Sequence, residues 1–220
     1  MKAGDLRFAG AILAVAGVLG LLAGALHPQG GLSHDYHQVV ATMLGSAQWP
    51  LAHWVALVYS IGATWALWLL LDGGWMRESP VAWAGARLAT VAGLFMAVQF
   101  AVELASRVEA GAYAAGQPAS LVSLVEPMQA VGWPALGIGY ALLALGSRAS
   151  APLLVRGVGA LGATALAVGG VLVEGFRLST FGPVFAVGAL TFIWLIWAGA
   201  KLAYRRAATA DEAARQLSPA

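Results

Sequence analysis

The chain has 220 residues, of which 60% are hydrophobic and 10% are charged, and its formal net charge is +2. A soluble domain carries about 25% charged residues, so this composition excludes an ordinary water-soluble surface and predicts a membrane protein. The small net charge argues against nucleic-acid binding, and the lack of cysteine excludes disulfides, thiol chemistry and cysteine-ligated metals.

Six apolar runs are long enough for membrane spans, which need about 20 apolar residues each. They cover roughly residues 8–26, 51–71, 81–104, 121–146, 153–173 and 181–202. The first run is longer than the about 7–15 apolar residues of a signal peptide, so we expect it to be a retained span. The sequence therefore predicts an all-α, six-helix membrane domain over residues 1–206 and a short cytoplasmic tail over residues 207–220.

The distribution of Lys and Arg predicts the orientation of these spans. With the N-terminus in the cytoplasm, Arg107 and Arg177 lie outside, whereas nine basic residues lie at or beyond cytoplasmic ends: Lys2, Arg7, Arg77, Arg148, Arg156, Lys201, Arg205, Arg206 and Arg215. Positive charge concentrates in cytoplasmic loops. We therefore expect both termini in the cytoplasm and the bundle in a bacterial-type inner membrane.

All four histidines fall in one segment of the chain. His27 ends the first apolar run, His53 begins the second, and His34 and His37 lie in the loop between them. The predicted orientation makes this loop extracytoplasmic. The four imidazoles would therefore gather at the outer face of the bundle.

The same loop has the pattern of a short amphipathic helix. Ser33 is a candidate N-cap and Gly45 a candidate stop. Between them, apolar side chains recur at helical spacing: Tyr36, Val39, Val40, Met43 and Leu44. This pattern predicts a helix that lies at the membrane interface or covers the end of the bundle.

Five of the six spans carry an ionisable residue near the predicted outer boundary, namely His27, His53, Glu103, Glu126 and Glu174. Mid-depth positions lack acids and bases. Charged groups within spans are costly and often functional. The sequence therefore predicts a ligand site at the outer end of the bundle.

Imidazole and carboxylate groups together are the usual ligands of Zn, Cu or Fe. The candidate metal ligands are His27, His34, Asp35, His37, His53, Glu103, Glu126 and Glu174. The chain contains no His-Glu-x-x-His run and no recognisable nucleophile arrangement. We therefore favour binding over hydrolysis at this site.

A b-type haem is the alternative occupant of the same end. His27 and His53 could supply its axial ligands, and Arg107 and Arg177 could meet its propionates. Without cysteine the haem would be held non-covalently. The sequence leaves metal and haem open.

Two other functions use the same residues differently. In a structural or assembly subunit, the outer glutamates would only tie helices together, through partners such as Arg107 and Arg177. A small-solute transporter is a third alternative, although carriers usually place charge near the bilayer midplane.

Rows of small residues, such as Gly159, Ala163 and Ala167, suit close helix packing. Beside the lipid bilayer, a second copy or a larger membrane complex is therefore an expected partner.

Overall fold

The computed structural model describes residues 3–28, 30, 35–77, 79–148 and 150–216, excluding the side chains of residues 3–4 and 205–216. This part of the chain is helical and contains no strand. Six helices are long and apolar enough to cross a membrane, which confirms the predicted class. The protein is therefore a multi-pass membrane protein.

The long helices follow the predicted runs, except that α8 continues as a helix to Gln216, through most of the predicted tail. They are α1 (Ala3–Leu26), α3 (Trp49–Asp72), α4 (Pro80–Ser106), α6 (Ser120–Gly146), α7 (Leu153–Gly169) and α8 (Val184–Gln216). The last turns of the fifth span are a π-helix, η2 (Gly170–Gly175), directly after α7. Pro127 and Pro134 both lie inside α6, which continues through them.

Shorter elements cover one end of the bundle. They are α2 (Tyr36–Gly45), the 3-10 turn η1 (Arg107–Glu109), α5 (Ala110–Ala114) and a second 3-10 turn, η3 (Ser179–Phe181). A helix therefore lies where the loop pattern predicted one, but its N-cap is Asp35, whose carboxylate accepts from the backbone N–H groups of His37 and Gln38. Ser33 and His34 lie outside the described residues.

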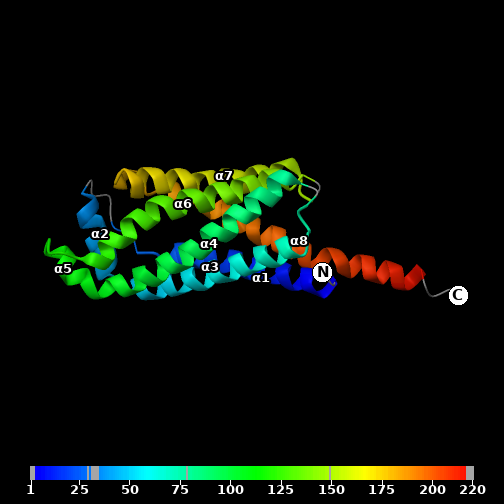
Figure 1. Cartoon of the computed structure of the whole chain (residues 1–220), viewed down its shortest axis with the longest axis horizontal. Helices are drawn as coiled ribbons and strands as arrows, with labels where there is room; N and C mark the ends of the chain where they lie inside the picture. The colour runs from blue at the N-terminus through cyan, green and yellow to red at the C-terminus, as the bar shows by residue number, and fades with distance from the viewer. Residues whose placement is uncertain (1–2, 29, 31–34, 78, 149, 217–220) are drawn as a thin grey trace.

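The six long helices form a closed ring in chain order. Each packs against the next, and α1 also packs against α8. Figure 1 shows α2 and α5 together at one end of the bundle, called here the polar end, and both termini at the opposite end, called here the terminal end. This arrangement brings the ends of α1, α3, α4 and α6 together at the polar end.

Glycine permits the closest helix contacts in this ring. A Cβ on Gly139 of α6 would lie 2.6 Å from the backbone nitrogen of Ala89 in α4, and one on Gly10 of α1 would lie 2.7 Å from the carbonyl oxygen of Gly199 in α8. No side chain fits at such distances. Helix association in lipid depends on this kind of close packing.

Candidate functional site

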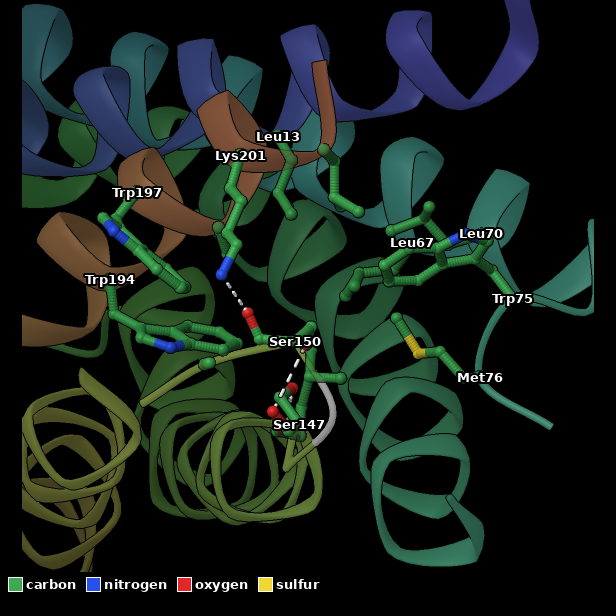
Figure 2. Close-up of a pocket in the computed structure, with 14 residues that line it drawn as sticks. Leu13, Leu67, Leu70, Trp75, Met76, Ser147, Ser150, Trp194, Trp197 and Lys201 are labelled. Carbon is green, nitrogen blue, oxygen red and sulfur yellow. Dashed lines mark hydrogen bonds between the residues drawn. The ribbon is translucent and has the colours of Figure 1, made fainter. Parts of the chain in front are cut away.

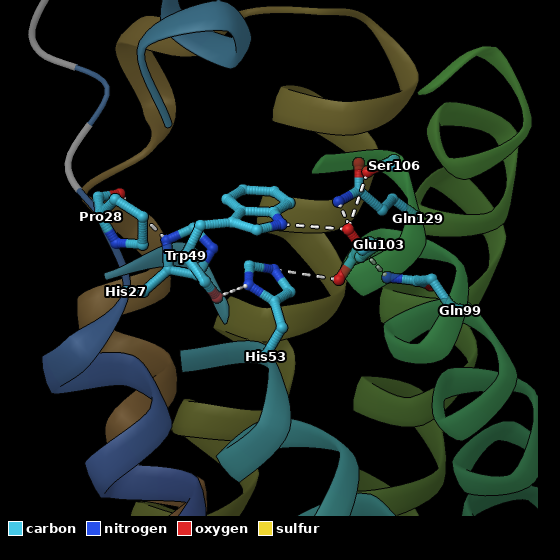
Figure 3. A network of polar contacts seen from close by, with 8 residues as sticks. All are labelled: His27, Pro28, Trp49, His53, Gln99, Glu103, Ser106 and Gln129. Carbon is cyan, nitrogen blue, oxygen red and sulfur yellow. Dashed lines mark hydrogen bonds and ion pairs between the residues drawn. The ribbon is translucent and has the colours of Figure 1, made fainter. Parts of the chain in front are cut away.

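The polar end contains a buried ion pair between two spans. His53 lies in the second turn of α3 and is 2% exposed, and Glu103 lies in the last turn of α4 and is 1% exposed. Nε2 of His53 is 3.1 Å from Oε2 of Glu103 (Figure 3). An imidazole and a carboxylate are therefore held together away from water.

The second nitrogen of His53 fixes the tautomer. Nδ1 is 2.8 Å from the carbonyl oxygen of Trp49, one turn earlier in α3. A carbonyl oxygen can only accept, so Nδ1 carries a hydrogen and donates it. Nε2 then meets the carboxylate either as a charged N–H group or as a lone pair facing a protonated acid. In both cases the imidazole Nε2 and the carboxylate share one proton.

Two glutamines complete the surroundings of the carboxylate. Nε2 of Gln99 in α4 donates to Oε1 of Glu103 at 3.0 Å, and Nε2 of Gln129 in α6 donates to the same oxygen at 2.6 Å. Oε1 therefore acts as an acceptor, while Oε2 faces the imidazole and accepts no aligned hydrogen bond from the described residues. The proton of the pair thus belongs between Oε2 and Nε2.

Trp49 connects the two halves of the site. Its indole stacks on the His53 ring, with 3.8 Å between ring centroids, and its Nε1 donates to the backbone oxygen of Glu103 at 3.0 Å. Stacking fixes the plane of the imidazole, and the hydrogen bond fixes the start of α3 against the end of α4. The orientation of the pair is therefore set by packing as well as by charge.

His27 lies beside this pair at the end of α1. Its ring centroid is 5.3 Å from that of His53 and 6.0 Å from that of Trp49, and its Nδ1 is 3.1 Å from the carbonyl oxygen of Pro28. Burial, with a smaller contribution from the neighbouring His53, lowers the pKa of His27 to about 4. His27 is therefore an uncharged imidazole at neutral pH.

We call these six residues the buried centre: His27, Trp49, His53, Gln99, Glu103 and Gln129. Around it lies a second set of polar contacts, called here the rim: Tyr36, His37, Tyr113, Glu126, Glu174 and Arg177. The rim joins α2 and α5 to the ends of α6, η2 and the chain that follows it.

Each rim contact connects two elements. The Tyr36 hydroxyl donates to Oε2 of Glu174 at 2.7 Å, and Nη2 of Arg177 donates to Oε2 of Glu126 at 2.6 Å. The Tyr36 hydroxyl is half-buried, and its burial together with the Glu174 charge raises its pKa. His37 stacks on the Tyr113 ring with 4.3 Å between centroids. The rim thus holds the short helices onto the bundle.

Two further residues fix the short helices through backbone groups. Nη1 of Arg107 donates to the carbonyl oxygens of Leu44 and Ser46 at the end of α2. The Glu109 carboxylate accepts from the backbone N–H groups of Leu121 and Val122 at the start of α6. Both side chains serve the attachment of helix ends.

The structure therefore separates the predicted ligands. His27, His53 and Glu103 come together in the buried centre, whereas His37, Glu126 and Glu174 lie in the rim with other partners and Asp35 caps α2. His34 lies outside the described residues. Among the residues described, no three His, Asp or Glu side chains form a group that could hold a metal ion.

Of the ion pairs expected between the outer glutamates and the two arginines, one is confirmed and one is wrong. Glu126 does pair with Arg177, but Glu103 pairs with His53, and Arg107 binds carbonyl groups of α2 instead. The hydrogen-bond partners of both arginines are groups other than the His27 and His53 rings. Those rings pack on each other at an ordinary aromatic distance, so a haem between them would require the two rings to separate.

Sequence reasoning did not assign a role to Gln99, Gln129 or Trp49 in this site. The spacing of four residues between Gln99 and Glu103 was the available signal, because side chains four apart share a helix face. Gln129 and Trp49 reach Glu103 from other helices, so only the packing of the bundle brings them there.

Comparison with known proteins adds no relative. No protein-family model matches the chain, and no curated protein and no solved structure matches it. The functional argument therefore depends on the geometry of the site.

Proposed function

We propose that this membrane protein takes up and releases a proton at the His53–Glu103 pair, and that this exchange is its functional event. The observation that carries the proposal is the buried contact of 3.1 Å between Nε2 and Oε2, with Nδ1 of the same ring already donating to Trp49. This arrangement leaves one proton for two groups inside the bundle.

The cost of burying the pair supports a functional role. Charged groups removed from water lose several kcal/mol of solvation, and apolar side chains of similar volume often replace a buried ion pair without loss of stability. Ionisable residues within spans are accordingly functional candidates by default. Packing alone would be served as well by apolar residues at positions 53 and 103.

His27 offers a route for the proton. As an uncharged imidazole it has one nitrogen that donates and one that accepts, and it is half-buried, with its ring beside that of His53. Imidazole is the side chain best suited to pass a proton near neutral pH. Protonation of the pair would change the contacts of α3 with α4 and α6, since these three helices supply its partners.

Difference infrared spectroscopy of the protein in lipid tests this proposal directly. We expect acidification to change carboxyl and imidazole bands in the wild type. Glu103→Gln should remove the component of the carboxyl band that arises from Glu103, whereas Glu126→Gln, the matched control in the rim, should leave that component in place. Absence of any pH-dependent band that depends on Glu103, over the pH range in which the protein stays folded, would overturn the proposal.

A second candidate is a transition metal ion, Zn, Cu or Fe, held in place of the proton after the side chains rearrange, because the described residues form no group of three ligands as they stand. The specific observation in its favour is that Nδ1 of both His27 and His53 lies at a backbone carbonyl, the arrangement that ligating histidines use to present Nε2. Gln99 and Gln129 would then act as outer-shell donors to the ligating carboxylate.

Metal analysis of the purified protein distinguishes the two candidates. One metal ion per chain, lost in His53→Gln and kept in His37→Gln, would favour the metal and overturn the proton proposal. A metal-free protein with the Glu103-dependent band would support proton exchange. Absence of both the metal ion and the Glu103-dependent band would indicate that the buried centre only stabilises helix packing.

A further inference from the structure

A small cavity lies at the terminal end of the bundle, remote from the buried centre. It has a volume of about 50 Å³ and lies between α1, α3, α6 and α8 (Figure 2). Its walls are largely apolar, with leucine side chains from α1, α3 and α6 and the indoles of Trp75, Trp194 and Trp197. Lys201 is the charged side chain among the residues that line it.

Lys201 is a half-buried cation without an acidic partner in the described part of the chain. Its Nζ donates to the carbonyl oxygen of Ser150 and lies 4.8 Å from the centre of the Trp197 ring. The ion pairs of the described residues are those of His53 and Arg177. Because an ammonium group has three donors, Lys201 can still donate to an anion.

Two serine side chains add polar groups to the same wall. Ser147 and Ser150 line the cavity, and their hydroxyls donate to the backbone oxygens of Leu143 and Ser147 respectively. Each hydroxyl oxygen keeps acceptor capacity, so the wall suits a ligand that brings both a negative charge and hydroxyl groups.

The surrounding charge also favours an anion. The described residues at the terminal end include the exposed arginines Arg7, Arg77 and Arg148, against the exposed acids Asp5 and Asp72. A positive field near the ends of the spans attracts anionic lipid headgroups, and basic pockets between membrane helices bind them. Free anions in water would gain nothing from the apolar walls.

We propose that this cavity binds the headgroup of an anionic phospholipid, with the phosphate at Lys201. The position fits, because Lys201 lies in the last turn of the apolar span Val184–Tyr204. The cavity is too small for a whole lipid, so it takes the phosphate and the adjoining glycerol, while the acyl chains remain in the bilayer beside the helices. The proposal does not depend on the function of the polar end.

Native mass spectrometry of the full chain in mild detergent tests this inference, with phosphatidylglycerol and phosphatidylcholine of equal chain length as probes. We expect phosphatidylglycerol to remain bound preferentially. Lys201→Gln should weaken its binding about tenfold, the effect of losing one charge-assisted hydrogen bond. Lys201→Arg should retain it. Arg7→Gln, which removes an equal charge outside the cavity and leaves the contact with Lys201 intact, should weaken it much less than Lys201→Gln does.

Three results would overturn the inference. Equal binding of both lipids would show that charge is not recognised. Equal weakening by Lys201→Gln and Arg7→Gln would show attraction to the surface as a whole. Displacement of the lipid by millimolar inorganic phosphate would identify a site for a free anion. If Lys201→Gln does not fold, Lys201→Met, which keeps an apolar stem but removes the charge, replaces it in the same comparison with Arg7→Gln.

Discussion

The buried centre and the rim of the polar end each contain one ion pair, and the shorter of the two is the less important for stability. Arg177 and Glu126 are 2.6 Å apart, but their side chains are 63% and 18% exposed. His53 and Glu103 are 3.1 Å apart and fully enclosed. Water screens the first pair and replaces its partners readily, whereas the second pair depends on the protein for its solvation.

This difference shows that burial, rather than distance, ranks the polar contacts of this protein. A rim residue that loses its partner can turn to water. A residue of the buried centre that loses its partner keeps an uncompensated polar group inside the bundle, which costs more than the contact itself contributed. Variants of the two regions should therefore differ in size of effect, and the following changes measure that difference.

Glu103→Ala should have the largest effect. It leaves His53 and the amides of Gln99 and Gln129 without their acceptor, and breaking a buried pair costs about 3–5 kcal/mol. The measurement is the free energy of unfolding in mixed micelles. Glu126→Ala is the matched control and should cost less than about 1 kcal/mol. Equal losses in the two variants would remove the distinction between centre and rim.

Trp49→Phe should have an intermediate effect of about 1 kcal/mol, the contribution of one hydrogen bond. The phenyl ring can still stack on His53, but it cannot donate to the backbone oxygen of Glu103. Trp54→Phe, at an indole that is 58% exposed on the same helix, is the control and should be neutral. The same measurement of unfolding free energy in mixed micelles covers both variants, and a neutral Trp49→Phe would contradict the role given to the indole.

Arg177→Ala should cost less than about 1 kcal/mol, and less still at high salt, because the pair is exposed. Arg177 also has a φ angle of +56°, in the left-handed region that favours glycine. Arg177→Gly should therefore be at least as stable as Arg177→Ala. An unfolding free energy lower for glycine than for alanine would contradict this interpretation of the rim.

His27→Gln should have the smallest effect at neutral pH, where His27 is already uncharged. Since burial lowers its pKa from 6.5 to about 4, the unfolded chain binds more protons than the folded one between these values. The stability of the wild type should therefore fall as the pH falls from about 6.5 towards 4. The unfolding free energy should change less with pH across this range in His27→Gln than in the wild type. Identical slopes of unfolding free energy against pH would contradict the burial given to this ring.

Most of the fold could be predicted because lipid imposes strict demands on a sequence. A run of about 20 apolar residues can satisfy its backbone in a membrane only as a helix, so the six spans followed from composition alone. The periodic apolar residues between 36 and 44 likewise predicted α2. The orientation of the bundle in the membrane stays a prediction from the positions of Lys and Arg.

The site was predictable only in part, because its contacts cross between helices. Glu103 and Arg107 are four residues apart, a spacing that favours a shared helix face and an ion pair. The Arg107 guanidinium instead donates to carbonyl oxygens at the end of α2, which lies beside it only in the folded bundle. His27 and His53 meet because α1 and α3 are neighbours, whereas His37 follows α2 to Tyr113 on α5.

The closed ring of helices has a consequence for biogenesis. α1 leaves the ribosome well before α8, the helix that covers its Gly10 surface. The small-residue face of α1 therefore stays exposed to lipid, or to insertion factors, until α8 has been synthesised. Release of a truncated chain that lacks α8 would leave this face open, and the unpaired first span would be the mark by which quality control could recognise the unfinished protein.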